Sequence, residues 1–292
     1  MMWHSEPGYL TFSKMSGHGN DFIVVDNMSG DFDMAWYLCA RQWCERRRSI
    51  GADGILVLEP SDQADFNLRI FNADGSEAEM CGNGARCAAA FALERNIAGS
   101  PLTFNTLAGI IEALVDKENV SIKLTDVHKS EGGRIITLEG GRVVPFHFID
   151  SGVPHAVIFI KDLEDASIVK GPLMAIRGDD ITEIGRAVRF HSLFSPRGAN
   201  VDFVEIVGPD RIRVRTYERG VEGETLACGT GIVASAITAT MTGGTKVESL
   251  TVEVAGGELS VRFHDQNSYY GDVWLSGEVS WVYEGLAPLP EE

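Results

Sequence analysis

Two segments of this chain resemble each other closely enough to indicate an internal duplication. MCGNGARCAAAFA begins at Met80 and ACGTGIVASAITA begins at Ala227, so Cys81 and Cys228 each open a Cys-Gly-x-Gly run. The two cysteines lie about half the chain length apart. Because duplicated segments fold alike and pack as related units, this repeat constrains the fold more than any other feature of the sequence.

Further similarities follow in the same order in both halves. They pair SGHGNDFIVV from Ser16 with SGVPHAVIFI from Ser151, GADGILVLE from Gly51 with GANVDFVEI from Gly198, and TLAGIIEALV, which contains Gly109, with EVAGGELSV, which contains Gly256. The first pair places Asn20 opposite His155. Matches that keep one order along the chain favour duplication over coincidence.

Each half predicts the same succession of elements. Strands rich in Val, Ile and Phe are expected at 21–26, 55–58, 66–71, 110–115 and 120–125, and again at 155–160, 201–206, 211–217, 258–263 and 272–277. A helix follows each cysteine, and the second has no charged residue from 229 to 242, which is typical of a buried helix. We therefore expect an α+β fold of two pseudo-symmetric domains. Each would be a mixed or antiparallel sheet curled around a central helix, with the active site in the cleft between the domains.

The expected boundary between the halves lies in the polar, glycine-rich segment DVHKSEGG at 126–133. This divides the chain into an N-terminal half, 1–128, and a C-terminal half, 129–292. We expect the last residues, about fifteen of them, to pack back on the first half.

Composition restricts the class of protein. The formal net charge of −17 argues against non-specific binding of nucleic acid, which needs Lys and Arg against phosphate. The sequence has no apolar run long enough to span a membrane, and residues 1–10 lack the apolar stretch of a signal peptide. We therefore expect a cytoplasmic protein. Five cysteines without a CxxC pair indicate neither a disulfide framework nor a zinc site.

A thiol at the start of a helix has two chemical consequences. The unpaired N–H groups there lower a thiol pKa from about 8.5 toward the range of about 3.5–7.5, and they also bind carboxylates, which glycines such as Gly82 and Gly84 allow to approach closely. Two such thiols around one bound carboxylate would suit inversion of the adjacent carbon, with one thiolate as base and one thiol as acid. A single Cys-Gly-x-Gly turn is more often structural, and GNGARC only partly matches a dinucleotide-binding loop.

Several segments, in this order, resemble the diaminopimelate epimerase family of cofactor-independent enzymes with two active-site cysteines. They are KMSGHGNDFIVVD, FNADGSEAEMCGNGARC, GVPHAVIF, GANVDFVEI and RTYERGVEGETLACGTG, and the resemblance spans about residues 12–285. It implies interconversion of LL- and meso-diaminopimelate for lysine and cell-wall precursor synthesis, no cofactor, no metal and a homodimer. Met1–Tyr9 extend beyond the family's usual start.

The resemblance also implies roles for individual residues. Cys81 and Cys228 match the acid/base pair, and His155 and Glu218 match residues that assist proton transfer. The residues whose N–H groups would hold the reacting carboxylate are Gly82, Asn83, Gly229 and Thr230. Those around the substrate's distal amino-acid group are Asn20, Asn72, Asn200 and Arg219. Some of these residues have ordinary alternatives: Asn20, Asn72 and Asn200 flank strands or turns, where Asn is common, Glu218 and Arg219 could form a surface pair, and His155 could be a loop histidine.

Three positions depart from the usual family pattern. Val153 stands where many members have Asn, Gly54 where some have Gln, and Thr230 where others have Ser. Val153 removes one polar contact to the distal end of the substrate, so it bears on specificity.

Other functions remain open at this point. A racemase for proline, hydroxyproline or an amino acid with a polar side chain would use the same two-thiol chemistry. A thiol redox protein, with Cys81 and Cys228 forming a reversible disulfide, is disfavoured by the missing CxxC motif. A binding protein for anions would not need thiols at both helix starts.

Overall fold

The computed structural model describes residues 8–289 except 33 and 131, so most of the Met1–Tyr9 segment lies outside the described residues. The described residues group into two compact units. The first comprises the residues up to Lys123 together with those from Ser276 onward, and the second comprises Leu124–Leu275. The division of the duplicated halves after residue 128 stays a prediction, because it concerns the sequence repeat rather than the contacts.

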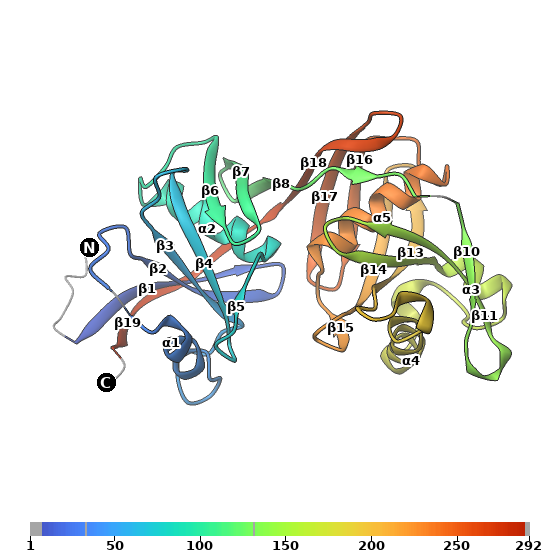
Figure 1. The fold of residues 1–292 in the computed structure, drawn as a ribbon, viewed down its shortest axis with the longest axis horizontal. Helices are drawn as coiled ribbons and strands as arrows, with labels where there is room; N and C mark the ends of the chain where they lie inside the picture. The colour runs from blue at the N-terminus through green and yellow to red at the C-terminus, as the bar shows by residue number, and fades with distance from the viewer. Residues whose placement is uncertain (1–7, 33, 131, 290–292) are drawn as a thin grey trace. The chain divides into compact units, whose positions relative to one another are not determined.

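The first unit is a sheet with two helices (Figure 1). Its elements are β1 (Tyr9–Gly17), β2 (Asn20–Asp26), α1 (Trp36–Trp43), β3 (Gly54–Glu59), β4 (Phe66–Asn72), β5 (Glu77–Ala78), α2 (Gly82–Glu94), β6 (Leu102–Thr106), β7 (Gly109–Asp116), β8 (Asn119–Lys123) and β19 (Ser280–Pro288). The strand β19 pairs antiparallel with β1, so the C-terminal strand belongs to the same sheet as the first.

The second unit repeats this arrangement with additional helical segments. Its elements are β9 (Val127–His128), β10 (Arg134–Thr137), η1 (Glu139–Gly141), β11 (Val143–Asp150), β12 (Pro154–Phe159), α3 (Ile160–Asp165), η2 (Leu173–Ala175), α4 (Gly178–Arg189), η3 (Ser192–Phe194), β13 (Asn200–Gly208), β14 (Arg211–Glu218), β15 (Gly223–Thr225), α5 (Gly229–Met241), β16 (Ser249–Val254), β17 (Gly257–Asp265) and β18 (Tyr269–Glu278). The boundary between the units falls inside β18.

The two units pair their strands in the same pattern. In the first, β2 runs parallel to β3, β3 antiparallel to β4, and β4 parallel to β6. In the second, β12 runs parallel to β13, β13 antiparallel to β14, and β14 parallel to β16. Each sheet is therefore mixed, and the matching topology agrees with the duplication that the sequence predicts.

A central helix lies against the sheet of each unit. The helix α2 contacts β1, β2, β7 and β8, and the helix α5 contacts β11, β12, β13 and β14. Every residue from Asn83 to Ala92 is buried, as is every residue from Gly231 to Ala239. Small side chains such as Ala88 and Ala236 allow the strands to approach the helix closely. The predicted α+β fold, with a mixed sheet around a central helix in each half, is confirmed.

The halves differ in the connection between their first two parallel strands. One helix, α1, connects β2 to β3, whereas α3, η2 and α4 lie between β12 and β13. The longer connection explains why the repeat spacing is shorter for the segments at Ser16 and Ser151 than for the cysteines. Among the described residues, no helix is both long and apolar enough to cross a membrane.

Candidate active site

Each cysteine of the predicted pair immediately precedes a central helix. Cys81 precedes α2 with φ −142° and ψ 114°, and Cys228 precedes α5 with φ −114° and ψ 110°. Both are extended N-cap residues, and their carbonyls accept the N–H groups of Ala85 at 2.8 Å and Ile232 at 2.9 Å. The N–H groups of the first turn have no partner within such a helix. The prediction that a helix begins directly after each cysteine is confirmed.

The second glycine of each Cys-Gly-x-Gly run packs against the sheet. A Cβ atom on Gly231 would lie 2.3 Å from Oδ1 of Asp202, and one on Gly84 would lie 3.0 Å from Cδ2 of Leu56. Only glycine fits at the first of these contacts without a shift, because the neighbouring carboxylate is buried. That Gly84 allows a carboxylate to approach the backbone stays a prediction, and the structure adds that this glycine also makes room for the core side chain of Leu56.

In the second unit, a chain of hydrogen bonds connects a buried carboxylate with the Cys228 thiol. Oδ2 of Asp202 lies 2.6 Å from Nδ1 of His155, and both side chains are fully buried. Nε2 of His155 lies 3.0 Å from Oγ1 of Thr230, which in turn lies 3.6 Å from Sγ of Cys228. The Thr216 hydroxyl donates a further hydrogen bond to Oδ1 of Asp202 at 2.7 Å. The structure thus brings together three residues of the predicted site, and it adds Asp202.

Asn200 determines which ring nitrogen of His155 carries the hydrogen. Its Oδ1 accepts the backbone N–H of Arg219 at 2.7 Å, so its amide group is turned toward His155, with Nδ2 at 3.4 Å from Nε2. An amide nitrogen only donates, and Nε2 must therefore accept. The hydrogen then lies on Nδ1, where the Asp202 carboxylate accepts it.

The charges around Cys228 favour its protonated form. Burial raises the pKa of the Cys228 thiol, and the negative charges of Glu218 and Asp202 raise it further. The hydrogen bonds that join Sγ of Cys228 to the Thr230 side chain and to the Gly231 backbone lower this pKa by a smaller amount. Burial also raises the pKa of Glu218, the last residue of β14. The sequence predicts that the helix start lowers the pKa of Cys228, and this prediction is wrong. Burial of the thiol raises its pKa and is the largest of the effects on it.

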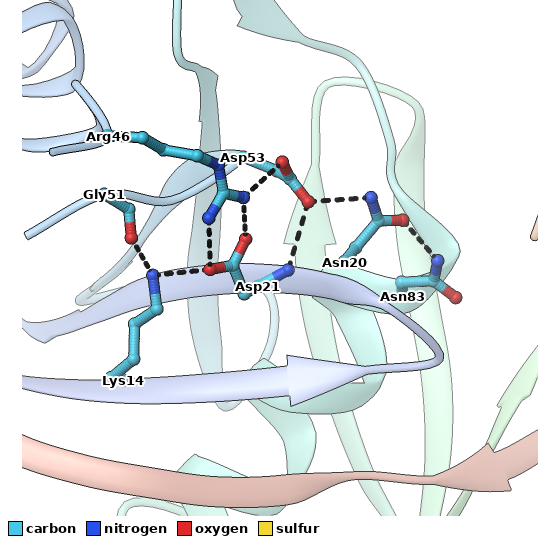
Figure 2. Close-up of polar contacts among 7 residues, drawn as sticks. All are labelled: Lys14, Asn20, Asp21, Arg46, Gly51, Asp53 and Asn83. Carbon is cyan, nitrogen blue, oxygen red and sulfur yellow. Dashed lines mark hydrogen bonds and ion pairs between the residues drawn. The ribbon is translucent and has the colours of Figure 1, made fainter. Parts of the chain in front are cut away.

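In the first unit, the corresponding positions form a chain of amides. Nδ2 of Asn20 donates to Oδ2 of Asp53 at 3.0 Å, and Oδ1 of Asn20 accepts Nδ2 of Asn83 at 2.6 Å (Figure 2). Oδ1 of Asn83 accepts Nη2 of Arg86 at 2.7 Å. The chain therefore runs from a carboxylate to a guanidinium through two amides, and it orients both Asn20 and Asn83.

A cluster of charged residues holds the carboxylate end of this chain (Figure 2). Arg46 donates to Asp21 at 3.1 Å and to Asp53 at 2.8 Å, while Lys14 lies 2.8 Å from Asp21 and donates to the carbonyl of Gly51. Burial opposes ionisation of Asp21, but the hydrogen bonds from Arg46 and Lys14 outweigh it and lower the pKa of this carboxyl. Arg46, in the basic segment after α1, is thus part of an ion-pair cluster.

The remaining predicted residues lie at strand ends and helix starts. Asn72 ends β4 and donates to Oγ of Ser76 at 2.9 Å, and Arg219 directly follows β14 with a half-buried side chain. Gly82 and Gly229 are the first residues of α2 and α5. Within the first unit Asn20 and Asn83 make direct contact, and within the second His155, Asn200, Thr230 and Cys228 do so.

Three further residues join these networks without having been predicted. Asp202 and Arg86 are fully buried, and Asp53 bonds both Asn20 and Arg46. For two of them the sequence carries a signal, a charged residue inside an apolar context, in NVDFVEI for Asp202 and in GNGARCAAA for Arg86. A buried charge is costly without partners, so each such position indicates a polar network.

The other cysteines are core residues. Cys39, Cys44 and Cys87 have exposed fractions of 0%, 2% and 0%. Burial raises the pKa of Cys39 to about 11 and those of Cys44 and Cys87 to about 12. Thiols of this kind are unreactive and pack as small apolar groups. Among the described residues, no group of three or more His, Cys, Asp or Glu side chains is placed to hold a metal ion.

The fold is similar to that of solved racemases and isomerases. A probable proline racemase from Agrobacterium radiobacter K84 matches with a TM-score of 0.69 at 16% identity, over 96% of this chain and 93% of that chain. A hydroxyproline epimerase from Agrobacterium vitis matches with a TM-score of 0.70 at 16% identity, over 100% of this chain and 95% of that one. At this identity the likeness establishes the fold alone.

Sequence comparison identifies the family. The family model described as diaminopimelate epimerase matches residues 12–129 and 147–282. The diaminopimelate epimerase of Aquifex aeolicus is 40% identical over 94% of this chain and 97% of its own length, and that of Hydrogenobaculum sp. is 39% identical over 95% and 98%. With both Cys-Gly-x-Gly helix starts inside the matched segments, the chain belongs to the diaminopimelate epimerase family.

Proposed function

We propose that this protein interconverts LL- and meso-diaminopimelate by moving the α-proton between two thiols, Cys81 and Cys228. The observation that carries the proposal is the matched placement of these thiols, each the N-cap of the central helix in its half of a duplicated fold. Membership of the epimerase family supports the same activity. One thiolate removes the proton and one thiol returns a proton to the opposite face, so the reaction needs no cofactor.

The helix starts supply the positive field for the reacting carboxylate. We assign this role to the N–H groups of Gly82, Asn83, Gly229 and Thr230, which lie in the first turns of α2 and α5. As the proton leaves, negative charge spreads onto the carboxylate, and preorganised N–H donors stabilise that charge without reorganising.

The distal end of the substrate carries a carboxylate and an ammonium group. We assign its recognition to Asn20, Asn72, Asn200 and Arg219, because amides offer both donors and acceptors and a guanidinium binds a carboxylate with two parallel hydrogen bonds. The fixed amide orientations of Asn20 and Asn200 support this assignment. His155 and Glu218 assist proton transfer from their positions around Cys228.

The activity places the protein in the synthesis of lysine and of peptidoglycan precursors, and we propose a cytoplasmic homodimer. The direct test is incubation with LL-diaminopimelate in D2O under reducing conditions. We expect meso-diaminopimelate to form and deuterium to enter the α-carbon. Absence of both would refute the function. Cys81→Ser and Cys228→Ser should each lower turnover by at least about 10²–10⁴-fold, and Cys87→Ser serves as a control because Cys87 lies in the core.

A second substrate class deserves a direct comparison. Val153 stands in the turn before β12, where Ser151 donates through Oγ to the carbonyl of Thr230 at 2.9 Å. Val153 stands where many members of the family have Asn, so this position bears on how the distal group of the substrate is recognised. Parallel assays with diaminopimelate, proline and histidine test this point. Faster turnover of proline or histidine would favour an amino-acid racemase over the proposed epimerase.

A further inference from the structure

We propose that the free enzyme holds Cys81 as the thiolate and Cys228 as the thiol, and that Arg86 and Asp202 are the positioning residues that fix this assignment. The inference rests on the proposed two-thiol function and adds to it which cysteine is the base at rest. It follows from two hydrogen-bond networks. The one beside Cys228 ends in a carboxylate and requires the thiol to donate, whereas the one at the start of α2 ends in a buried guanidinium.

In the network of the second unit, each hydrogen bond has a defined donor and acceptor. Because Nδ1 of His155 donates to Asp202, Nε2 is left as an acceptor, and the Thr230 hydroxyl donates to it at 3.0 Å. The Thr230 hydroxyl has one hydrogen, and it donates this hydrogen to His155, so it has none to donate to Cys228. Its oxygen can only accept from Cys228, which lies at 3.6 Å, so the cysteine must supply S–H.

The Asn200 amide gives independent support for this direction. Its Oδ1 is occupied by the Arg219 N–H at 2.7 Å, and its Nδ2 faces Nε2 of His155. Two donors therefore converge on Nε2, which excludes a hydrogen at that atom. Among the described residues, the charged groups that act on Cys228 are the carboxylates of Asp202 on β13 and Glu218 on β14, and both disfavour a thiolate.

The network in the first unit carries the opposite charge. Arg86 is fully buried, and the described groups that accept its hydrogen bonds are the Gly82 carbonyl at 3.5 Å, Nδ1 of His18 at 3.1 Å and Oδ1 of Asn83 at 2.7 Å. None of these acceptors is a carboxylate, and Nε of Arg86 has no partner among the described residues.

A buried guanidinium without a carboxylate favours a negative charge nearby. Burial lowers the pKa of the Arg86 guanidinium, and among the described residues the sulfurs of Cys87 and Cys81 act in the opposite direction. Cys87 is fully buried and its pKa is about 12, so Cys81 is the group that takes the charge. The thiolate of Cys81, at the start of the same helix, also lies in the favourable field of the helix N-terminus.

The assignment defines the first proton transfer. The Cys81 thiolate takes the α-proton and becomes a thiol, while the carbon–hydrogen electron pair remains on the substrate as a carbanion. The carbanion then takes the S–H proton of Cys228, which becomes the thiolate. One proton has left the substrate and one has entered it, and exchange with solvent restores the resting form.

Ultraviolet absorbance of thiolates tests the assignment without substrate. Wild-type protein, Cys81→Ser and Cys228→Ser are titrated under reducing conditions. The other cysteines stay silent at neutral pH, since burial raises their pKa values to about 11 and 12. We expect Cys81→Ser to lose the neutral-pH thiolate absorbance and Cys228→Ser to keep it. Loss of this absorbance in Cys228→Ser, with retention in Cys81→Ser, would overturn the proposal.

Substitution of Arg86 tests the first positioning residue. In the Cys228→Ser background, Arg86→Met should raise the pKa of Cys81 by about 1–3 units, and Arg86→Lys should restore most of the shift because it keeps the charge. Arg95→Met is the matched control, since Arg95 pairs with Glu284 at the far end of α2. An unchanged pKa in a folded Arg86→Met variant would exclude Arg86 from this role.

Nuclear magnetic resonance of ¹⁵N-labelled histidine tests the second network. The ring nitrogens of His155 should show hydrogen on Nδ1 and none on Nε2, and hydrogen on Nε2 would contradict the assigned direction. In the Cys81→Ser background, Asp202→Asn should lower the pKa of Cys228 by about one unit, and no change would remove Asp202 from this role. These readouts need no turnover, whereas a failure of the proposed function would appear in the D2O assay with diaminopimelate.

Discussion

The two halves of this protein place the same scaffold around two different polar networks. In both, a cysteine N-caps a buried helix beside a pair of parallel strands. The second half surrounds its cysteine with His155, Thr230 and Asp202, and the first half has Asn20, Asn83 and Asp53 near the start of its helix. Imidazole and hydroxyl groups can transfer protons, whereas amides can only donate and accept hydrogen bonds.

This difference shows how a duplicated fold can acquire two roles. The backbone geometry that presents a thiol and a row of N–H groups is retained in both halves, because it depends on strand pairing and on small residues at the helix start. The side chains that set charge and proton transfer are free to differ. Under the proposed assignment, the second half holds a proton on Cys228 and the first half holds a negative charge on Cys81.

The largest effect is expected when the second half is made to resemble the first. His155→Asn removes the imidazole of the network while keeping a polar side chain, and it should lower kcat by about 10²–10⁴-fold. Steady-state assays with diaminopimelate measure this change. His147→Asn is the matched control, since His147 lies on β11 of the same unit, outside the network. A His155→Asn variant with near wild-type kcat would remove His155 from proton transfer.

A smaller effect, on the free energy of unfolding, is expected when the second glycine of each Cys-Gly-x-Gly run, Gly84 or Gly231, is replaced by alanine. Gly231→Ala should destabilise the protein by about 1–3 kcal/mol, because its Cβ would lie 2.3 Å from the buried Asp202 carboxylate. The shortest contact of Gly84→Ala is with the end of the flexible Leu56 side chain at 3.0 Å, and a gain of about 0.5–1 kcal/mol in helix propensity offsets the strain. Urea unfolding of both variants measures the difference. Equal destabilisation would show that the two helix starts pack alike.

The smallest expected effects are changes in folding stability with pH. Because the pKa of Asp21 is lowered on folding, its stabilisation is present above its unfolded pKa and is lost as pH falls through the folded pKa. Because the pKa of Glu218 is raised, its ionised form opposes folding at neutral pH, and stability increases as pH falls through the folded pKa. Asp21→Asn should therefore destabilise at neutral pH, and Glu218→Gln should stabilise. Denaturant unfolding at neutral and acidic pH checks both signs.

Much of the fold could be predicted from the sequence because local signals agree with the tertiary structure. The apolar runs at 55–58 and 201–206 become β3 and β13, and the glycine-rich turn after each cysteine becomes a helix start. The repeat then required both halves to adopt the same topology. The extra helices α3 and α4 belong to one half alone, so the repeat did not predict them.

The polar networks could be predicted only in part. Family motifs pointed to His155 and Asn20, whose partners lie on other strands and are distant in sequence. Asp202, Asp53 and Arg86 join the networks through strand register and helix packing, which a single sequence does not reveal. The raised pKa of Cys228 depends on burial beside Glu218, and the motif alone suggested the opposite direction.

The most direct test of the central claim, that two thiols act on one carbon, is the fate of the α-proton in a single passage from LL- to meso-diaminopimelate. The reaction is run in D2O and stopped at low conversion, and both isomers are analysed by mass. The account predicts deuterium at the inverted carbon of every product molecule and none in the recovered substrate, because the proton removed by one thiol is not the one returned by the other. Product that retains its original α-proton would contradict the account and indicate a single base.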